Sequence, residues 1–201
     1  VVLNTIVAES FKEIADELEG AENFDMACHD MIKKLFTDHH RIVFNGNGYT
    51  DEWIEEAARR GLPNIPSMVD AIPALTTEKA INLFEKFGVF TEAELKSRAE
   101  IKYEAYAKAI NIEAKSMIDI AGKQIIPSVI SYTTELANSV VSVSEAGVDS
   151  SVQKELLDTV TGCLKDMKAA YTKLVEVTNK GADVNGAKDQ ATYYRDVVKT
   201  A

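Results

Sequence analysis

Thr91-Glu92-Ala93-Glu94-Leu95-Lys96-Ser97-Arg98 is the stretch that decides the fold, because it opens the longest element that the sequence predicts. Thr91 and Glu94 have the spacing of a capping box, in which each side chain satisfies a backbone amide of the other residue at a helix start. The helical pattern that follows scarcely breaks before Gly147. About 50 residues at a rise of 1.5 Å each would span roughly 75–80 Å.

One face of this expected helix is apolar at helical spacing. Its members are Tyr103, Tyr106, Ile110, Met117, Ile120, Ala121, Ile126, Val129, Ile130, Leu136, Ala137 and Val140. Pro127 lies within this stripe, and a proline lacks one helical amide and clashes with the preceding turn. We therefore expect a kink or an interruption at Pro127.

Two further helices follow. Gly147–Ser151 predicts a turn that leads into a helix cap, and the next helix should run to about Asn179. Its apolar residues recur in alternating steps of four and three, which is typical of a packing seam. They are Leu156, Val160, Cys163, Met167, Ala170, Leu174 and Val177. A last helix is expected over about 187–199. Because short connections make neighbouring helices antiparallel, residues 91–201 should form a long helical hairpin with a third helix against it.

Residues 1–90 predict shorter helices, near 1–19, 23–39, 51–60 and 78–87. An extended segment at Arg41–Phe44 and an irregular connection with Pro63, Pro66 and Pro73 separate them. The expected fold class is all-α: a helical bundle with a long antiparallel hairpin over 91–201, preceded over 1–90 by shorter helices and the irregular proline-containing connection.

Composition favours a soluble globular protein, with 46% hydrophobic and 27% charged residues. No apolar run approaches the ~18–20 residues that span a bilayer, so no membrane contact is expected. Residues 1–90 carry 8 Lys/Arg against 16 Asp/Glu and residues 91–201 carry 14 against 16, so the net charge of −10 is concentrated in the first part. An acidic chain without a basic patch is a poor nucleic-acid binder.

Cys28 and Cys163 are predicted to be core thiols rather than a disulfide, in a cytoplasmic protein.

The segment Val43-Phe-Asn-Gly-Asn-Gly-Tyr-Thr-Asp-Glu-Trp53 contains two consecutive Asn-Gly pairs. Asn and Gly tolerate positive φ, so we expect a sharp turn at Asn45–Gly48. Thr50 should then cap a helix whose first turn, with Asp51 and Glu52, suits the helix dipole. Exposed amides in such a turn could bind an anion, but the two acidic residues would repel it.

Catalytic motifs are absent from the sequence: it has no GxxxxGK, no GxGxxG after a strand and no HExxH. The histidines are His29, His39 and His40, and the two adjacent ones would point about 100° apart on a helix, so no metal site is predicted. No catalytic, cofactor-binding or metal-binding residue is assigned. Arg59 and Arg60 are expected to pair with Glu55 and Glu56 four residues earlier.

Three residues stand out as structural or interface candidates: Trp53, Arg98 and Glu113. Glu113 lies among apolar residues of the long helix and is expected to be drawn into an interface, where a buried carboxylate needs a cation such as Arg98 or Lys115. A role in binding substrate or metal is the alternative. Trp53, with Tyr103 and Tyr106, is predicted to be a core or interface aromatic.

Several segments resemble, in order, the C-terminal region of type III glutamine synthetases, over roughly residues 1–130. They are Asn4–Glu9, Val43–Trp53, Arg60–Asn64, Leu83–Lys86, Ser97–Ile101 and Ile110–Ala114. The resemblance implies a parent enzyme that joins ammonia to glutamate through γ-glutamyl phosphate, using ATP and Mg or Mn. It also implies that the catalytic segments precede this region, so the chain alone is expected to be inactive and to hold no cofactor.

The same resemblance implies two kinds of partner: an upstream catalytic domain of the same polypeptide and identical subunits in a ring assembly. The chain opens on Val1-Val2-Leu3, already in a helical pattern and without a cap, which indicates a longer polypeptide. The helical region would then serve subunit packing or oligomer assembly. The alternative is a free-standing all-α adaptor that binds a partner helix, but it explains neither the uncapped first helix nor the unpaired Arg41–Phe44 segment.

Overall fold

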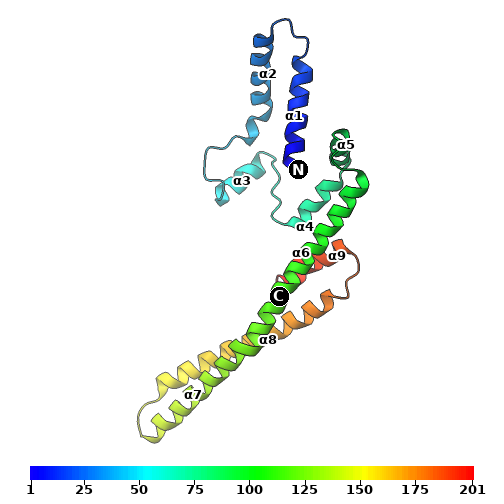
Figure 1. Ribbon diagram of the computed structural model, residues 1–201. Coiled ribbons are helices and arrows are strands. Elements are labelled where there is room, and N and C mark those ends of the chain that lie inside the picture. Colours follow the sequence, from blue (N-terminus) through cyan, green and yellow to red (C-terminus); the bar gives the residue numbers. More distant parts are fainter. The chain divides into compact units, whose positions relative to one another are not determined.

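The computed structural model describes residues 1–201 and consists of helices and loops without a strand, so the predicted all-α class is confirmed (Figure 1). Contacts divide the chain into two compact units, Val1–Ala99 and Glu100–Ala201. The expected division after residue 90 stays a prediction. None of the helices combines the length and the apolar character needed to cross a bilayer.

Unit 1 begins with a helical hairpin of α1 (Val2–Leu18) and α2 (Phe24–His39). Gly20 adopts a φ of +83°, which an L side chain rarely tolerates, and so ends α1. Asn23 caps α2, because its side chain accepts a hydrogen bond from the Met26 amide at 3.1 Å. The expected extended segment Arg41–Phe44 is only partly correct: residues His40–Ile42 form the 3₁₀ turn η1, and the backbone becomes extended at Val43.

The rest of unit 1 consists of short helices and the first part of a long one. They are α3 (Asp51–Arg59), α4 (Met68–Ala71), the 3₁₀ turn η2 (Ile72–Thr76), α5 (Glu78–Lys86) and the start of α6 (Glu92–Ile120). The best-buried large side chains here are Val69, Ile72, Phe84 and Leu95, none more than 4% exposed. An ion pair of 2.7 Å between Lys86 and Glu9 joins α5 to α1.

The capping box that opens α6 is confirmed. The Glu94 amide donates to Thr91 Oγ1 at 3.3 Å, and the Thr91 amide donates to Glu94 Oε2 at 2.8 Å. Helical structure then runs without a break to Glu145, through α6, the π-helical turn η3 (Ala121–Ile125) and α7 (Ile126–Glu145). The length expected from the sequence is therefore correct.

The π-helical turn is the form that the predicted interruption at Pro127 takes. Proline cannot donate the amide hydrogen bond of a regular α-helix, and its ring clashes with the carbonyl one turn earlier. Directly before it, the Ile126 amide donates to the carbonyl of Ala121, five residues back. This wider turn places an extra residue in front of the proline, so the helix continues instead of ending.

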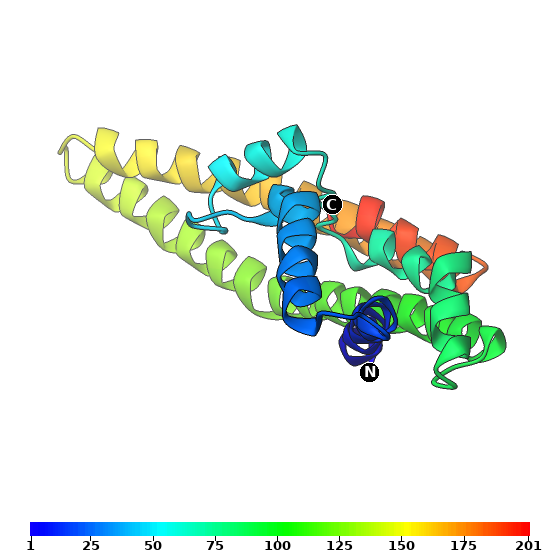
Figure 2. The same cartoon turned by 90° about the horizontal axis from the view of Figure 1, so that it is seen from above.

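In unit 2, α7 packs against α8 (Ser151–Gly181), and the two helices lie side by side in both views (Figures 1 and 2). The predicted antiparallel hairpin is thus confirmed. The covered face of α8 steps in fours and threes, as expected for a seam. Its members are Leu157, Val160, Leu164, Met167, Tyr171, Leu174, Thr178 and Gly181.

The predicted seam on α8 was only partly correct. Val160, Met167 and Leu174 belong to it, and Val177 is half-buried beside it. The other predicted members, Leu156, Cys163 and Ala170, are exposed because the covered face is rotated toward Leu157 and Leu164. Cys163 is therefore a surface thiol, and the prediction that it lies in the core is wrong. Both cysteines are free, and the other, Cys28, is half-buried. Periodicity alone is compatible with two overlapping apolar stripes on α8. Only the contact with α7 shows which of the two is covered.

The chain ends in α9 (Ala187–Tyr193) and the π-helical turn η4 (Tyr194–Val198), which packs back on α8. This confirms the expected third helix. Tyr194 is 3% exposed, and its ring lies against Gly181 so closely that a Cβ at position 181 would be 2.8 Å from Cζ. The Tyr193 hydroxyl also donates to the Val177 carbonyl at 3.1 Å. These contacts fasten the chain end to α8.

We expect Gly181→Ala to destabilise unit 2 by about 1–3 kcal/mol, because the added methyl group forces the buried Tyr194 ring to move. Urea denaturation followed by far-UV circular dichroism measures this change. Gly162→Ala in the same helix is the control: no atom lies within 4 Å of its Cβ position, so relief of the glycine penalty should stabilise α8 by about 0.5–1 kcal/mol. Equal effects of the two substitutions would contradict the packing argument.

Candidate functional site

The Asn45–Gly48 turn in unit 1 is built differently from the expectation. Neither Gly46 nor Gly48 has a positive φ, and no residue other than glycine does. Gly46 is instead required by a close approach: a Cβ there would lie 2.4 Å from Cζ of the Phe44 ring. The predicted reason for the glycine, backbone freedom, is therefore wrong, since packing of Phe44 over the backbone leaves no room for a side chain.

Thr50 precedes α3 as expected, but its hydroxyl does not cap the helix. That hydroxyl donates to the Asn47 carbonyl at 2.9 Å, while the Asn47 side chain accepts from the Tyr49 amide at 3.1 Å. The two hydrogen bonds close the loop on itself. Asp51 and Glu52 do occupy the first turn of α3, where the helix dipole favours negative charge.

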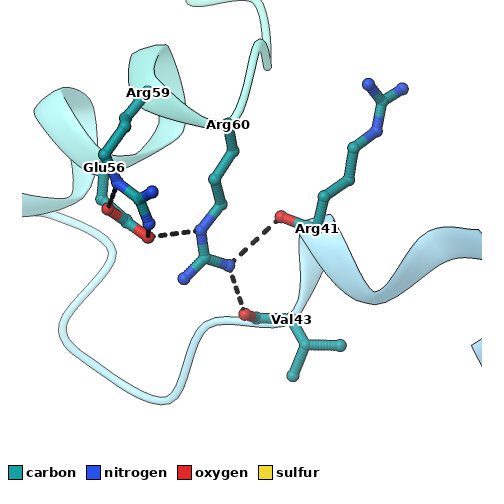
Figure 3. Close-up of polar contacts among 5 residues, drawn as sticks. All are labelled: Arg41, Val43, Glu56, Arg59 and Arg60. Carbon is teal, nitrogen blue, oxygen red and sulfur yellow. Dashed lines mark hydrogen bonds and ion pairs between the residues drawn. The ribbon is translucent and has the colours of Figure 1, made fainter. Parts of the chain in front are cut away.

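Arg60 holds the start of this loop in place, as Figure 3 shows. Its Nε donates to Glu56 Oε1 at 2.6 Å, and its Nη1 donates to the carbonyls of Val43 at 2.6 Å and Arg41 at 3.2 Å. One guanidinium thus links α3 to the segment that follows α2, across 17 to 19 residues of sequence. Only arginine carries enough donors in a fixed fork for this arrangement.

Glu56 is shared by two arginines. The predicted pair of Arg60 with Glu56 is confirmed. The predicted pair of Arg59 with Glu55 is wrong, because Arg59 Nε and Nη2 both contact Glu56, each at 2.6 Å. A separation of three residues also brings helical side chains together, and here it permits a bidentate contact.

These contacts lower the pKa of Glu56 from its ordinary value of 4.5 to about 2, chiefly through hydrogen bonds from Arg59 and Arg60. A carboxyl group with a lowered pKa in the folded state stabilises that state above the ordinary pKa. We therefore expect this stabilisation to be present above pH 4.5 and to be lost as the pH falls towards about 2.

Trp53 is the sole tryptophan of the chain, so denaturation followed by its fluorescence at several pH values tests this expectation. Glu56→Gln should remove part of the acid dependence, because its amide cannot carry the charge that the arginines stabilise. Glu55→Gln is the matched control, one residue away and without an ion pair. An unchanged pH profile in Glu56→Gln would contradict the expected role of the carboxylate.

Trp53 is half-buried in the same cluster. Its ring lies 4.3 Å from that of Phe44, and the Arg60 guanidinium lies 5.8 Å from its centre. Its role as a core or interface aromatic stays a prediction. Tyr49, by contrast, is completely exposed at the tip of the fastened loop. The arrangement can therefore present one aromatic side chain from a loop that its own hydrogen bonds close.

Arg98, on α6 within unit 1, is exposed and stacks on an aromatic ring. Its guanidinium carbon lies 4.2 Å from the centre of the Phe90 ring, and that ring lies 5.5 Å from Phe84. Such a contact is worth roughly 0.5–1 kcal/mol at an exposed site. Arg98 thus covers the Phe90 ring, which in turn contacts the buried Phe84, and a further interface role stays a prediction.

Glu113 lies in unit 2, where its side chain is exposed and forms no ion pair. The predicted burial and the predicted pairing with Lys115 are wrong, because the covered face of α6 passes through Ala107 and Ala114 instead.

Of the two tyrosines predicted to lie in the core, Tyr103 is buried and Tyr106 is half-buried.

Glu113 instead lines a cavity of about 300 Å³, together with residues from α8 and from the end of the chain. Lys199 lies on the same cavity wall. Sequence reasoning missed this cavity, because nothing in the spacing of residues 110–121 relates them to Val198 or Lys199. No group of three or more His, Cys, Asp or Glu side chains in the structure is arranged to hold a metal ion.

Comparison with known proteins identifies the family. A family model described as the glutamine synthetase C-terminal domain matches residues 27–144. The chain is 35% identical over 171 residues to a glutamine synthetase of Butyrivibrio fibrisolvens, across 84% of this chain and 24% of that protein. It is 33% identical over 207 residues to the type-3 glutamine synthetase of Dictyostelium discoideum, across 98% of this chain and 28% of that protein.

A glutamine synthetase of Bacteroides fragilis is 28% identical over 209 residues, which cover 99% of this chain and 29% of the relative. The chain therefore spans about a quarter of the length of the curated relatives that it matches. The family model covers more than half of the chain, and two relatives align with it along nearly its whole length. The resemblance to the C-terminal region of type III enzymes is confirmed, and the chain belongs to the glutamine synthetase C-terminal domain family.

Proposed function

We propose that this chain serves as the helical, non-catalytic C-terminal domain of a type III glutamine synthetase. The whole enzyme would form glutamine from glutamate, ammonia and ATP, with Mg or Mn as the metal. The observation that carries the proposal is the alignment: relatives named glutamine synthetase match 84–99% of this chain, but the matched part is only 24–29% of their own length. The additional length in the relatives is sufficient for a separate catalytic region.

Exposed apolar surface in unit 1 supports a packing role. Several large side chains of the α1–α2 hairpin lie open to solvent, with Ile32 at 68% and Phe36 at 62% exposure. Others are Leu3, Val7, Phe11, Phe24 and Met26. Contiguous apolar surface on a soluble protein usually marks an interaction site. We propose that the upstream catalytic domain of the same polypeptide covers this hairpin.

Unit 2 offers a second apolar surface along its hairpin. The exposed residues outside the cavity lining described above are Ile112, Ile120, Ile130, Val141, Val148, Val152 and Leu156. They occur on α6, on α7, in the turn that contains Val148 and at the start of α8, so they extend along much of the hairpin. We propose that identical subunits pack here in the homo-oligomer, which is thus the proposed second partner. Both free thiols are compatible with the proposed cytoplasmic location.

The experiment starts from the native polypeptide, isolated with an antibody against this chain. We expect a polypeptide several times larger than 22.1 kDa that forms a large assembly and makes glutamine when ATP, glutamate and ammonia are supplied. Deletion of residues 91–201 from it should disperse the assembly. If the shortened protein still forms the native assembly and keeps its full activity, the proposed packing role is wrong.

The free-standing adaptor remains the second candidate, because α1 and α2 border a groove of about 860 Å³. Ile14, Met31 and Leu35 form part of its apolar lining. Its charged lining residues are Glu13, Glu17, Lys34 and Asp38, of which Lys34 pairs with Glu17, so Glu13 and Asp38 leave the groove acidic. A partner helix with basic flanks would fit such a groove. The same isolation distinguishes the two functions: a native polypeptide near 22.1 kDa without ligase activity would favour the adaptor.

A further inference from the structure

The cavity in unit 2 has the composition of a small-molecule site. Its volume of about 300 Å³ lies at the lower end of the range of about 300–1,000 Å³ typical of such sites. The walls are mostly apolar and come from α6, α8 and the last residues of the chain; they include Ala114, Met117, Met167, Leu174 and Val198. A ligand of this size would be small and largely apolar.

Two π-helical turns meet at this cavity. Ala121 of η3 and Val198 of η4 both line it, although they are 77 residues apart in sequence. Such turns are rare and occur frequently at functional sites, because the extra residue widens the helix locally. Next to Ala121, a Cβ at Gly122 would lie 2.8 Å from the hydroxyl of Tyr171, which also lines the cavity. Gly122 thus makes room for this part of the wall.

Two charged side chains of opposite sign complete the lining: Glu113 on α6 and Lys199 just after η4. No hydrogen bond or ion pair engages either side chain, so they do not neutralise each other. Two neighbouring acidic residues of α6 are paired, since Glu104 binds Lys108 and Asp119 binds Lys123. The cavity lining therefore combines mostly apolar side chains with the carboxylate of Glu113 and the ammonium group of Lys199, and Ala201 lies on the same wall.

We propose that this cavity binds a free α-amino acid with an apolar side chain. The ammonium group of the ligand would face Glu113, its carboxylate would face Lys199, and its side chain would lie against Met117, Met167 and Leu174. Charge-assisted hydrogen bonds are the strong ones, and a zwitterion supplies one for each free charge. Methionine side chains adapt to ligands of different shape, so leucine and methionine should both fit.

The test is titration calorimetry of the purified 201-residue chain with L-leucine and L-methionine. Leucinamide lacks the carboxylate and 4-methylpentanoate lacks the ammonium group, while both keep the apolar side chain. Each is expected to bind at least about tenfold more weakly than leucine, the loss that corresponds to one charge-assisted hydrogen bond. Equal binding of the three compounds, or no binding of either amino acid, would overturn the proposal.

Substitutions locate the site. Glu113→Gln and Lys199→Gln should each weaken leucine binding about tenfold. Lys115→Gln is the control, since it lies two residues from Glu113 and does not line the cavity. Ala170→Leu should fill the cavity and abolish binding, with the helical circular dichroism signal unchanged. If Lys115→Gln weakens binding as much as Glu113→Gln, the proposal is wrong. The assay measures binding to the chain itself, so it does not depend on the proposed ligase activity.

Discussion

Phe84→Ala is expected to destabilise unit 1 by about 3–5 kcal/mol, the usual cost of removing a buried aromatic ring. Phe84 is 2% exposed on α5 and packs against the Phe90 ring. Few other large side chains in this unit are buried as deeply. Neighbouring side chains therefore cannot readily fill the cavity that removal of the Phe84 ring would leave. The loss also removes the surface on which the Phe90 and Arg98 stack rests.

Urea denaturation followed by Trp53 fluorescence measures this effect, because the only tryptophan lies within unit 1. Phe36→Ala is the matched control: the same chemical change at a 62% exposed position should alter the free energy of unfolding by less than about 0.5 kcal/mol. A similar midpoint for both variants would show that Phe84 does not contribute to a core in solution.

Tyr194→Ala is expected to destabilise unit 2 by about 3–5 kcal/mol. The side chain is 3% exposed, and burial raises the pKa of its hydroxyl. Its ring occupies the space above Gly181 and holds η4 against α8. Without the ring, the last turn of the chain loses its main contact with the hairpin. Amide hydrogen exchange should therefore accelerate in η4 and at the end of α8.

A double-mutant cycle makes this prediction specific. Gly181→Ala is destabilising in the natural chain because its methyl group meets the Tyr194 ring. In the Tyr194→Ala background that ring is absent, so Gly181→Ala should become neutral or stabilising, as alanine favours the helix over glycine. If the two changes in the free energy of unfolding simply add, the methyl group at position 181 does not meet the Tyr194 ring. Each substitution would then destabilise the protein for another reason.

The sequence by itself determined the features that depend on neighbours three or four residues apart. The capping box of Thr91 and Glu94 was predicted correctly because both of its hydrogen bonds close within one turn. The helical class and the hairpin followed from periodicity and from the short connection near Gly147. The family was also recognisable, because its segments, such as Val43–Trp53, are contiguous in sequence.

Tertiary structure alone decided which faces are covered and why particular residues are needed. Cys163 lies outside the seam because α7 contacts a neighbouring stripe of α8, and two overlapping stripes have the same period. Gly46 is needed because the Phe44 ring lies over its backbone, not because of its φ. Glu113 and Lys199 share a cavity only because the chain end folds back on α8. Each of these outcomes depends on contacts between residues distant in sequence, which local patterns do not encode.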